Sequence, residues 1–291
     1  GPGTPGGGDP MTLSQSDFEF VSAMVKREAA IVLAPGKEYL VEARLIPVAR
    51  QVGAASVADF IGNLQRKPNS ADQRRIIDAL TTNETSWFRD REPFTALSDV
   101  VLPELVKSRG SSRQLRFWSA ASSSGQEAYS LAITLQEALP PGWSYDIMGS
   151  DISTEMIKRA EAAEYSQVEV NRGLPATQLV QYFERVGAHW RIAPHLRRNV
   201  TFKHMNLTTP LPPMPPFDVI FLRNVLIYFD VATKKSVLRN VARLLRPDGW
   251  LFLGAAETTI GIDDNYERVA AGRTSAYRVR NAVPAGAVRK G

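Results

Sequence analysis

Small and polar residues separate two apolar stretches in the segment SAASSSGQEAYS, residues 119–130. The stretch before it is typical of a strand and the stretch after it of a helix. α/β proteins hold nucleotides at such a junction, because N–H groups at the start of the helix can face the ligand. Gly125 stands alone where a dinucleotide fingerprint has three glycines. The loop therefore predicts a ligand without a pyrophosphate, or else an ordinary turn in which Ser124 and Glu127 form a capping box.

Asp151 stands at the end of the next strand-like stretch, YDIMGSD. In doubly wound folds an acidic residue at this place binds the two hydroxyls of a ribose. The alternative is that Asp151 caps the helix that follows. Together the loop and Asp151 favour a nucleoside site, and a nucleoside without a pyrophosphate indicates S-adenosylmethionine rather than NAD.

The segment TTNETSWFRDREPF, residues 81–94, mixes polar side chains with Trp87 and Phe88. A loop that covers a ligand would have this composition, and so would a helix terminus followed by exposed aromatic residues. The polar residues that could contact a ligand are Asn83, Thr85 and Arg89.

The segment FDVIFLRNVLIYFD continues an apolar strand into polar residues and Tyr228. Strand ends of this kind carry the chemistry of open α/β folds. Alternatively, Tyr228 and Phe229 pack under the following helix, which Asp230 would cap. DNA amino-methyltransferases have an Asn/Asp-Pro-Pro-aromatic signature here, whereas in this chain the prolines precede the strand, which counts against that class of nucleic-acid methyltransferases.

Amphipathic helices are predicted for the N-terminal part of the chain. Ser14, with Asp17 three residues later, is a capping arrangement, and Pro47 predicts a kink or a break in the second helix. The third and fourth helices each begin with a serine. The four segments span residues 13–32, 38–53, 56–65 and 70–83.

From about Leu115 onward strand-like and helix-like stretches alternate, which predicts a doubly wound and largely parallel sheet. A hairpin at 266–280 would close one edge, and residues 165–200 interrupt the alternation with a small β excursion around Gly187. The expected strands are 115–119, 145–151, 200–206, 217–224 and 250–257, and the expected helices are 127–139, 154–165 and 231–245.

These patterns predict an α/β protein with an N-terminal all-helical domain and a small inserted β-subdomain. The predicted parts are a tag remnant at 1–10, a helical domain at 11–90, a connecting helix or linker at 91–114, the sheet domain at 115–281 with its insertion at about 165–200, and a disordered tail at 282–291.

Composition narrows the class of protein. The 291 residues carry a net charge of +5, with an isoelectric point near 9.5, which favours an acidic partner. The chain has no cysteine, so disulfides, thiolate metal sites and a cysteine nucleophile are excluded, and a reducing cytoplasm fits. No apolar run reaches the roughly 18 residues of a membrane helix, and the histidine spacing predicts no metal site.

Five segments together resemble one known family: TTNETSWFRD, FWSAASSSGQEAYSLA, GSDIS, MNL and FLRNVLIYFD. In order and spacing they are similar to the chemoreceptor glutamate methyltransferases, the CheR-type family of bacterial chemotaxis, over about residues 13–280. The resemblance implies a Rossmann-like S-adenosylmethionine methyltransferase that esterifies glutamate side chains on receptor helices for sensory adaptation and releases S-adenosylhomocysteine. A cofactor-binding scaffold without turnover and a nucleic-acid methyltransferase are the alternatives.

The resemblance also implies roles for individual residues. Arg89 and Tyr228 would be catalytic, by positioning the accepting carboxylate, and Arg89 would also contact the cofactor. Gln126 and Ala128 depart from the glutamate and proline that are usual in the family. The other implied cofactor contacts are Asn83 and Thr85 in the covering segment, Ala120 and Glu127 near the methionine part, Asp151 at the ribose, Asn206 and Leu207 at the adenine, and Asn224 and Val225 after the fourth strand.

The expected partner is the acidic helical cytoplasmic domain of a chemoreceptor. Arg44 and Arg50 are the candidate receptor-binding residues, although six positions do not align them on one helix face. A basic stretch at 184–204 is a second candidate surface. Family members that grip a C-terminal receptor peptide resemble one another in a longer, glycine-rich loop of the insertion. This chain has a short turn with Gly187 alone, so the resemblance implies no binding of a C-terminal tethering peptide. We also expect a monomer that neither binds nucleic acid nor inserts into a membrane.

Overall fold

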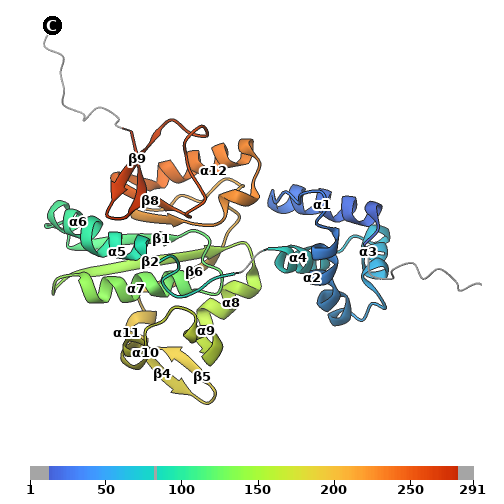
Figure 1. Cartoon of the computed structure of the whole chain (residues 1–291), viewed down its shortest axis with the longest axis horizontal. Coiled ribbons are helices and arrows are strands. Elements are labelled where there is room, and N and C mark those ends of the chain that lie inside the picture. The colour runs from blue at the N-terminus through green and yellow to red at the C-terminus, as the bar shows by residue number, and fades with distance from the viewer. Residues whose placement is uncertain (1–12, 82–83, 281–291) are drawn as a thin grey trace, which may run out of the picture. The chain divides into compact units, whose positions relative to one another are not determined.

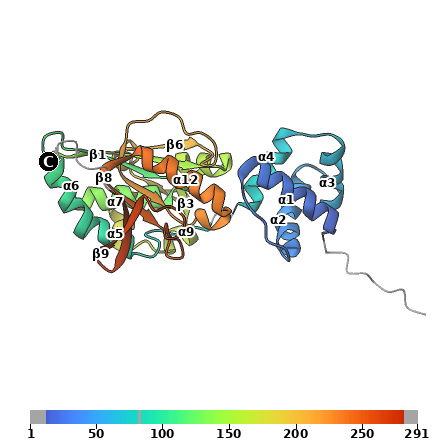
Figure 2. The same cartoon turned by 90° about the horizontal axis from the view of Figure 1, so that it is seen from above.

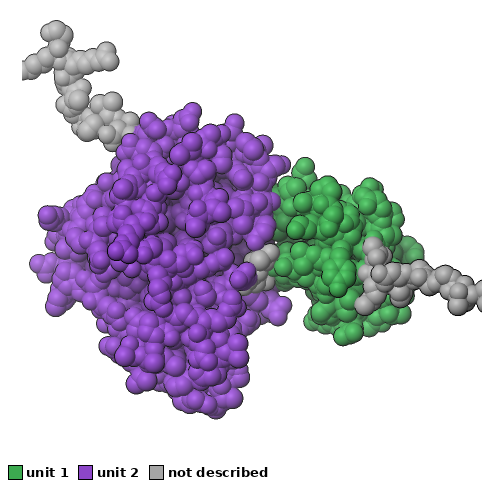
Figure 3. All heavy atoms as spheres, in the orientation of Figure 1, with its two compact units in different colours: residues 1–82 green, residues 83–291 purple. Residues whose placement is uncertain are grey.

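The computed structural model describes residues 13–81 and 84–280, which form two compact units (Figure 1). The first unit ends at Thr82 and the second begins at Asn83 (Figure 3). The predicted tag remnant and tail lie outside the described residues. The predicted domain bounds stay predictions.

The first unit contains four helices within residues 13–81: α1 (Gln15–Ala29), α2 (Glu38–Gln51), α3 (Val57–Arg66) and α4 (Ser70–Leu80). The hydroxyl of Ser14 accepts a hydrogen bond from the N–H of Asp17, so the predicted cap of α1 is confirmed. The cap of α4 is Asn69 rather than the predicted serine, because the Asn69 side chain accepts from two N–H groups of the first turn. Pro47 lies inside α2, which continues as one helix.

Within residues 84–280, seven strands form one sheet in the order β6-β2-β1-β7-β8-β10-β9. β6, β2, β1, β7 and β8 pair in parallel, and the C-terminal hairpin of β9 and β10 adds two antiparallel strands at the β8 edge. The predicted sheet and its closing hairpin are therefore confirmed. The strands are β1 (Gln114–Ser119), β2 (Ser144–Asp151), β6 (Val200–His204), β7 (Phe217–Leu222), β8 (Leu245–Leu253), β9 (Tyr266–Ala271) and β10 (Thr274–Val279).

Alternate residues of the central strands pack against helices on opposite faces of the sheet. Phe117 and Phe221 belong to a core with α7 (Gln126–Ala138), while Trp118 and Ile220 belong to a second core with α12 (Val231–Leu244). Figure 2 gives a second view of these elements, turned by 90°. Helix α8 (Thr154–Ala162) follows β2. The α/β fold class is confirmed.

The segment that the sequence analysis assigned to a connection packs into the core of the second unit. It forms α5 (Glu92–Ala96), a π-helical turn at Leu97–Val101 and α6 (Leu102–Ser108). Phe94 and Leu97 are buried against α7 and the sheet. These helices therefore cover one face of the sheet.

The insertion forms the predicted small sheet, in the antiparallel order β3-β5-β4. Its parts are β3 (Glu164–Ser166), α9 (Gln167–Asn171), α10 (Ala176–Tyr182), β4 (Phe183–Val186), β5 (His189–Ile192) and α11 (Pro194–Arg197). Gly187 has a φ of +58° in the β4–β5 turn. The indole of Trp87 packs edge-on against Tyr165 and Phe183, with ring centroids 5.0 and 5.3 Å away. Trp87 thus attaches the segment before α5 to the inserted β-subdomain.

Across residues 13–81 and 84–280, none of the helices combines the length and the apolar character that crossing a lipid bilayer requires.

Candidate functional site

The carboxyl ends of β1, β2, β6 and β7 lie at one edge of the sheet, because these strands pair in parallel. Backbone contacts tie the segments that follow them together. The N–H of Ala120 donates to the carbonyl of Phe221 at 2.8 Å, and the N–H of Met205 donates to the carbonyl of Asp151 at 3.0 Å. This edge brings together the candidates Ala120, Asp151, Asn206, Leu207, Asn224 and Val225.

Asp151 ends β2 and is only 7% exposed. Its Oδ2 accepts the N–H of Ser123 and its Oδ1 accepts the N–H of Ser153, each at 2.9 Å. Burial raises the pKa of Asp151, and the two N–H donors oppose that shift. The alternative role as a helix cap is wrong, because Ser153 caps α8. Asp151 therefore holds the loop after β1 beside the end of β2.

Glu127 lies in the first turn of α7 and is also buried. Its Oε1 accepts from the hydroxyl of Ser119 at 2.8 Å, and its Oε2 lies 3.5 Å from the guanidinium of Arg223. Burial raises the pKa of Glu127, and Arg223 is the strongest opposing influence. The capping-box alternative is wrong: Gly125 occupies the N-cap without a side-chain bond, and Ser124 donates to Gln126.

The loop between β1 and α7 depends on a glycine. Gly125 has a φ of +102°, and a Cβ there would lie 2.9 Å from the Tyr165 hydroxyl and 3.0 Å from the Ala160 methyl. The Oγ of Ser122 is buried and has no hydrogen-bond partner among the described residues. The loop thus offers a polar atom that the protein itself leaves unsatisfied.

The segment before α5 has an unusual backbone, and Thr85 and Arg89 are both half-buried on it. Phe88, Asp90 and Arg91 have φ values of +48°, +66° and +50°, a region that costs energy for such residues. Arg89 donates to the carbonyl of Glu84 at 3.0 Å. The predicted contact Asn83 lies outside the described residues.

Two hydrogen bonds and one close backbone approach hold this strained segment in place. The backbone N–H of Trp87 donates to the carbonyl of Arg172 at 3.0 Å, and the backbone N–H of Phe88 donates to the hydroxyl of Ser130 at the same distance. Gly173 must be a glycine, because a Cβ there would lie 2.2 Å from the carbonyl oxygen of Trp87. Strain that the surroundings enforce in this way is typical of functional segments.

Arg223 connects the segment to the sheet edge, and the sequence analysis did not include it among the site residues. Its side chain is 1% exposed and donates to Asp90 at 2.6 Å. The same guanidinium faces Glu127, while its Nε and Nη1 have no hydrogen-bond partner among the described residues. An arginine directly after a fully buried strand was the available signal, since a buried charge requires partners.

Glu257, after β8, is the second residue that the sequence analysis missed. Its carboxylate accepts N–H groups from Asn224, Val225, Ile227 and Gly254 at 2.5–3.2 Å. It thereby shapes the turn after β7, in which Asn224 has a φ of +60°. The rule that located Asp151 would have found Glu257, because Asp151 ends one parallel strand and Glu257 follows another at the same edge.

The remaining candidates differ in how they are held. Asn206 accepts the N–H and the hydroxyl of Thr208 at 2.9 and 2.7 Å, and Leu207 is buried in the α12 core. Tyr228 is half-buried in a 3₁₀ turn, Leu226–Tyr228, and its hydroxyl makes no hydrogen bond within residues 13–81 and 84–280. Asp230 caps α12, as the sequence alternative for this stretch expected.

The receptor candidates Arg44 and Arg50 lie on α2 in the first unit. Arg50 is exposed, whereas Arg44 is half-buried and donates to the carbonyl of Leu80 at 3.3 Å. Arg44 therefore also has a structural role at the end of α4.

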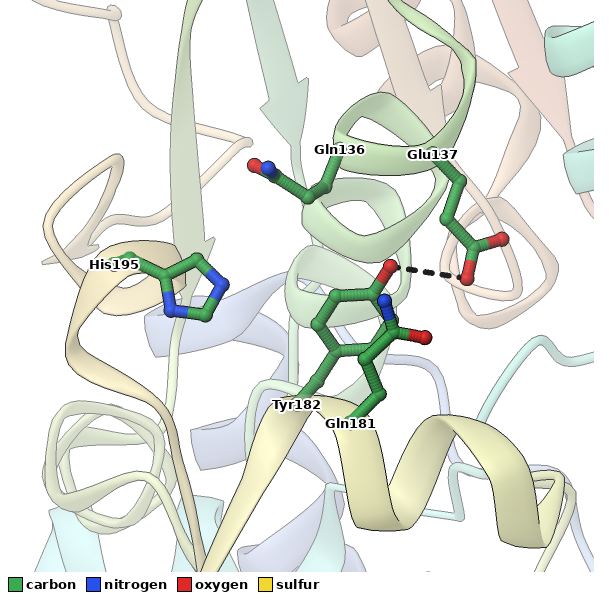
Figure 4. Close-up of a pocket in the computed structure, with 5 residues that line it drawn as sticks. All are labelled: Gln136, Glu137, Gln181, Tyr182 and His195. Carbon is green, nitrogen blue, oxygen red and sulfur yellow. Dashed lines mark hydrogen bonds between the residues drawn. The ribbon is translucent and has the colours of Figure 1, made fainter.

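A cavity of about 560 Å³ lies toward the other end of α7, and Figure 4 shows the residues that line it. Glu137, at the opposite end of α7 from Glu127, accepts the Tyr182 hydroxyl at 3.2 Å. Ten helical residues separate the two glutamates by about 15 Å. Burial, with the neighbouring Glu137, raises the pKa of Tyr182 to about 12. This cavity is thus a separate polar hollow lined by Gln136, Glu137, Gln181, Tyr182 and His195.

Comparison with known protein families covers both units. The CheR methyltransferase all-alpha domain matches residues 16–81, and the CheR methyltransferase SAM binding domain matches residues 83–274. The chain belongs to the CheR methyltransferase family. The predicted family and the predicted cofactor, S-adenosylmethionine, are thereby confirmed.

Relatives of this CheR-family chain are similar over most of their length. Chemotaxis protein methyltransferase 1 of Pseudomonas aeruginosa is 37% identical, across 93% of this chain and 100% of the relative. Chemotaxis protein methyltransferase Cher2 of Pseudomonas putida is 36% identical, across 89% and 96%. A solved TehB-like SAM-dependent methyltransferase from Corynebacterium glutamicum is 14% identical over 66% of this chain and 92% of that chain, with a TM-score of 0.36.

The residues at this edge of the sheet fit the chemistry of S-adenosylmethionine. Each oxygen of Asp151 accepts one backbone N–H and keeps a lone pair for a hydroxyl donor. The unsatisfied Oγ of Ser122 lies in the loop that precedes α7. The cofactor carries no phosphate, so the single glycine of this loop suffices.

Proposed function

We propose that this protein transfers the methyl group of S-adenosylmethionine to glutamate side chains on the cytoplasmic helices of a chemoreceptor, which forms methyl esters. The observation that carries the proposal is the match of both CheR domains along residues 16–81 and 83–274. The relatives' name, chemotaxis protein methyltransferase, supports a receptor substrate. The motif order in the sequence supports glutamate as the acceptor.

The proposed cofactor contacts divide between two parts of the site. Asp151 would accept the ribose hydroxyls, and Asn206 and Leu207 would flank the adenine. Ala120 and Glu127 would lie near the methionine end, where the Glu127 carboxylate can pair with an ammonium group. The other proposed contacts are Asn83, Thr85 and Arg89 before α5, and Asn224 and Val225 after β7.

The proposed chemistry needs alignment rather than proton transfer. When bound, S-adenosylmethionine supplies an electrophilic sulfonium methyl. A glutamate carboxylate, with a reference pKa of about 4.3, is already an anion at neutral pH, so no general base is required. Holding such a nucleophile in line can supply about 7–11 kcal/mol of a barrier.

Arg89 and Tyr228 are the proposed positioning groups for that carboxylate. A guanidinium can donate charge-assisted hydrogen bonds to a carboxylate, and the Tyr228 hydroxyl is uncommitted within the described residues. The strained, pinned backbone at 88–91 supports a fixed placement of Arg89. Exclusion of water would fall to the segment that carries Thr85 and Arg89.

A methyl-transfer assay with radiolabelled cofactor and receptor-bearing membranes tests the proposal. A base-labile label on a receptor-sized band is the expected result, because methyl esters hydrolyse in base. Tyr228→Phe should lower turnover while the affinity for S-adenosylhomocysteine, measured by calorimetry, stays close to that of the wild type. Cofactor binding without any label would indicate a scaffold, and label on nucleic acid would indicate the other alternative.

The receptor-binding surface is proposed to include Arg44 and Arg50 on α2. Reversing both charges should raise the KM for receptor without changing cofactor affinity, with the largest effect at low salt. Because Arg44 also bonds to Leu80, the Arg50 variant alone is the cleaner measurement. An unchanged KM at low salt would remove this surface from the proposal.

The inserted β-subdomain is proposed not to bind a C-terminal tethering peptide. Its β4–β5 turn is short and has one glycine, and its basic residues are partly engaged: Arg191 pairs with Glu164, and Arg185 stacks on Trp190 at 5.1 Å. Receptors without a tether should therefore be methylated. Micromolar binding of such a peptide, abolished by changes around Gly187, would contradict this.

A further inference from the structure

The turn after β7 carries three of the residues that the proposed function uses: Asn224, Val225 and Tyr228. Its backbone is irregular. Asn224 has a φ of +60°, a region that costs energy for a residue other than glycine, and a single 3₁₀ turn, Leu226–Tyr228, follows. Such a segment needs contacts from elsewhere in the fold to keep one conformation.

Those contacts come from Glu257, which lies after β8 and is 8% exposed. Its Oε1 accepts the N–H groups of Asn224 at 2.5 Å and of Gly254 at 2.8 Å. Its Oε2 accepts the N–H groups of Val225 at 3.1 Å and of Ile227 at 3.2 Å. An ionised carboxylate has about four lone-pair sites, so the backbone occupies all of them. Glu257 therefore does not bind a ligand or remove a proton from the substrate, and it can affect the reaction only through the turn that it holds.

The loop that carries Glu257 is itself fixed. The N–H of Glu257 donates to the carbonyl of Gly254 at 3.0 Å, and the Tyr277 hydroxyl on β10 donates to the hydroxyl of Thr258 at 3.2 Å. A Cβ on Gly254 would lie 2.5 Å from Oδ1 of Asn224 and 2.6 Å from Oε1 of Glu257. The loop after β8 and the turn after β7 thus pack together too closely to admit a methyl group.

We infer that Glu257 is a positioning residue for methyl transfer, which acts by holding the turn on which Tyr228 lies. The inference rests on the proposed function and adds a residue to it. The N–H groups of Val225 and Ile227 lie three positions and one position before Tyr228, so the carboxylate fixes the backbone from which the tyrosine hydroxyl projects. Displacement of a positioning group by about 1 Å can lower a rate about a hundredfold. Glu257 thereby influences the rate of transfer without touching cofactor or substrate.

Two variants disturb this contact in different ways. Glu257→Gln replaces one accepting oxygen with an NH2 group, which cannot accept the two N–H groups that it meets. Gly254→Ala keeps the charge but places a methyl group where the side chains of Glu257 and Asn224 lie. Asp218→Asn is the matched control, because Asp218 is a buried carboxylate that accepts the backbone N–H of Arg116 at 2.8 Å, at the opposite edge of the sheet.

With receptor-bearing membranes as substrate, Glu257→Gln and Gly254→Ala should each lower kcat about ten- to a hundredfold. The Kd for S-adenosylhomocysteine should rise by a smaller factor, because Asn224 and Val225 are only part of the proposed cofactor site. Asp218→Asn should keep the kcat of the wild type. Thermal unfolding of each variant sets an assay temperature at which all of them are folded.

A double-mutant cycle with Tyr228→Phe separates positioning from a purely structural role. Residues that act as a unit have non-additive effects on kcat. Tyr228→Phe should lower kcat in the wild type, but it should change kcat by a factor close to one in the Glu257→Gln background, where the hydroxyl is already misplaced. In the Asp218→Asn background, Tyr228→Phe should lower kcat as much as in the wild type.

The contrary results are distinct. Equal factors for Tyr228→Phe in the wild type and in Glu257→Gln would overturn the inference, since Glu257 would then not act through Tyr228. A folded Glu257→Gln enzyme with the kcat of the wild type would overturn it as well. If Glu257→Gln does not fold, the same cycle with Gly254→Ala decides. In each case a wild type that methylates the receptor leaves the proposed function standing, whereas a wild type that labels no receptor overturns both.

Discussion

The two edges of the main sheet use buried charge in opposite ways. At the amino-terminal edge, Arg109 donates to Asp218 at 2.8 Å and to both oxygens of Asp248 at 2.6 and 2.9 Å. At the carboxyl-terminal edge, Arg223 reaches Asp90 at 2.6 Å but lies 3.5 Å from Glu127. One arginine is fully engaged by its partners, and the other keeps unsatisfied donors.

The pKa shifts follow the same division. Hydrogen bonding to Arg109 lowers the pKa of Asp248, whereas burial raises the pKa of Asp151 and of Glu127. The amino-terminal edge thus stabilises its charges within the fold. The carboxyl-terminal edge keeps carboxylates that the fold alone does not fully compensate, which is expected where a ligand completes the environment. The pairing of the arginines and the direction of the carboxyl pKa shifts therefore distinguish a structural ion cluster at the amino-terminal edge from a candidate site at the carboxyl-terminal edge.

Arg109→Met should give the largest effect, a loss of about 3–5 kcal/mol in the free energy of unfolding, because the buried Asp218 would lose its closest guanidinium and keep only the N–H of Arg116 and the more distant Arg246, and Asp248 would lose both of its bonds to Arg109. Urea unfolding measures this. The affinity of the folded variant for S-adenosylhomocysteine should not change. A stable variant with weakened cofactor binding would reverse the assignment of the two edges.

Asp151→Asn should mainly affect binding. The loss of a charged acceptor costs about 1.5–3 kcal/mol per hydrogen bond, so cofactor affinity should fall at least tenfold. The free energy of unfolding should fall by roughly 1 kcal/mol, because the asparagine side chain has an NH2 group in place of one of the two oxygens that accept a backbone N–H. Calorimetry and urea unfolding on the same preparation provide both values. Unchanged affinity in the folded variant would remove Asp151 from the cofactor site.

Arg223→Met should cost less stability than Arg109→Met, about 1–2 kcal/mol. The reason is that Glu127, whose pKa burial already raises, can take up a proton when its partner is removed. Cofactor binding by the variant should therefore weaken as the pH falls, starting at a higher pH than in the wild type. A stability loss equal to that of Arg109→Met would show that both edges are structural clusters.

Lowering the pH should change the stability contributions of the two edges in different ways, and this is the smallest of the predicted effects. Asp151 and Glu127 have folded pKa values above their unfolded values, so their contribution to stability rises as the pH falls through the folded values toward about 4. Asp248 has a lowered pKa, so its contribution is lost only as the pH falls below about 4. As the pH falls from neutrality toward about 4, the stabilisation by S-adenosylhomocysteine should therefore shrink while the free protein is not destabilised by these groups. Thermal unfolding with and without the ligand measures both.

Much of the architecture was predictable from local patterns. The alternation of strands and helices after Leu115 located every parallel strand of the sheet, and small residues around Gly125 marked the loop before α7. Side-chain periodicity and caps depend on near neighbours in the chain, so they can be read from the sequence. The Asn69 cap is the exception, because Asn and Ser serve equally well and stood next to each other.

The position of Asp151 at the end of a parallel strand was likewise determined by the sequence, since parallel strands end at one edge. The partners of the buried charges were decided by the tertiary structure. Arg223 meets Asp90 and Glu127 across long separations in the chain, and Glu257 holds the turn at Asn224 from another strand. Such contacts depend on strand order and on how segments cross the sheet edge. Hydrophobic periodicity reports which face of an element is buried, but it does not specify which distant residue lies against it.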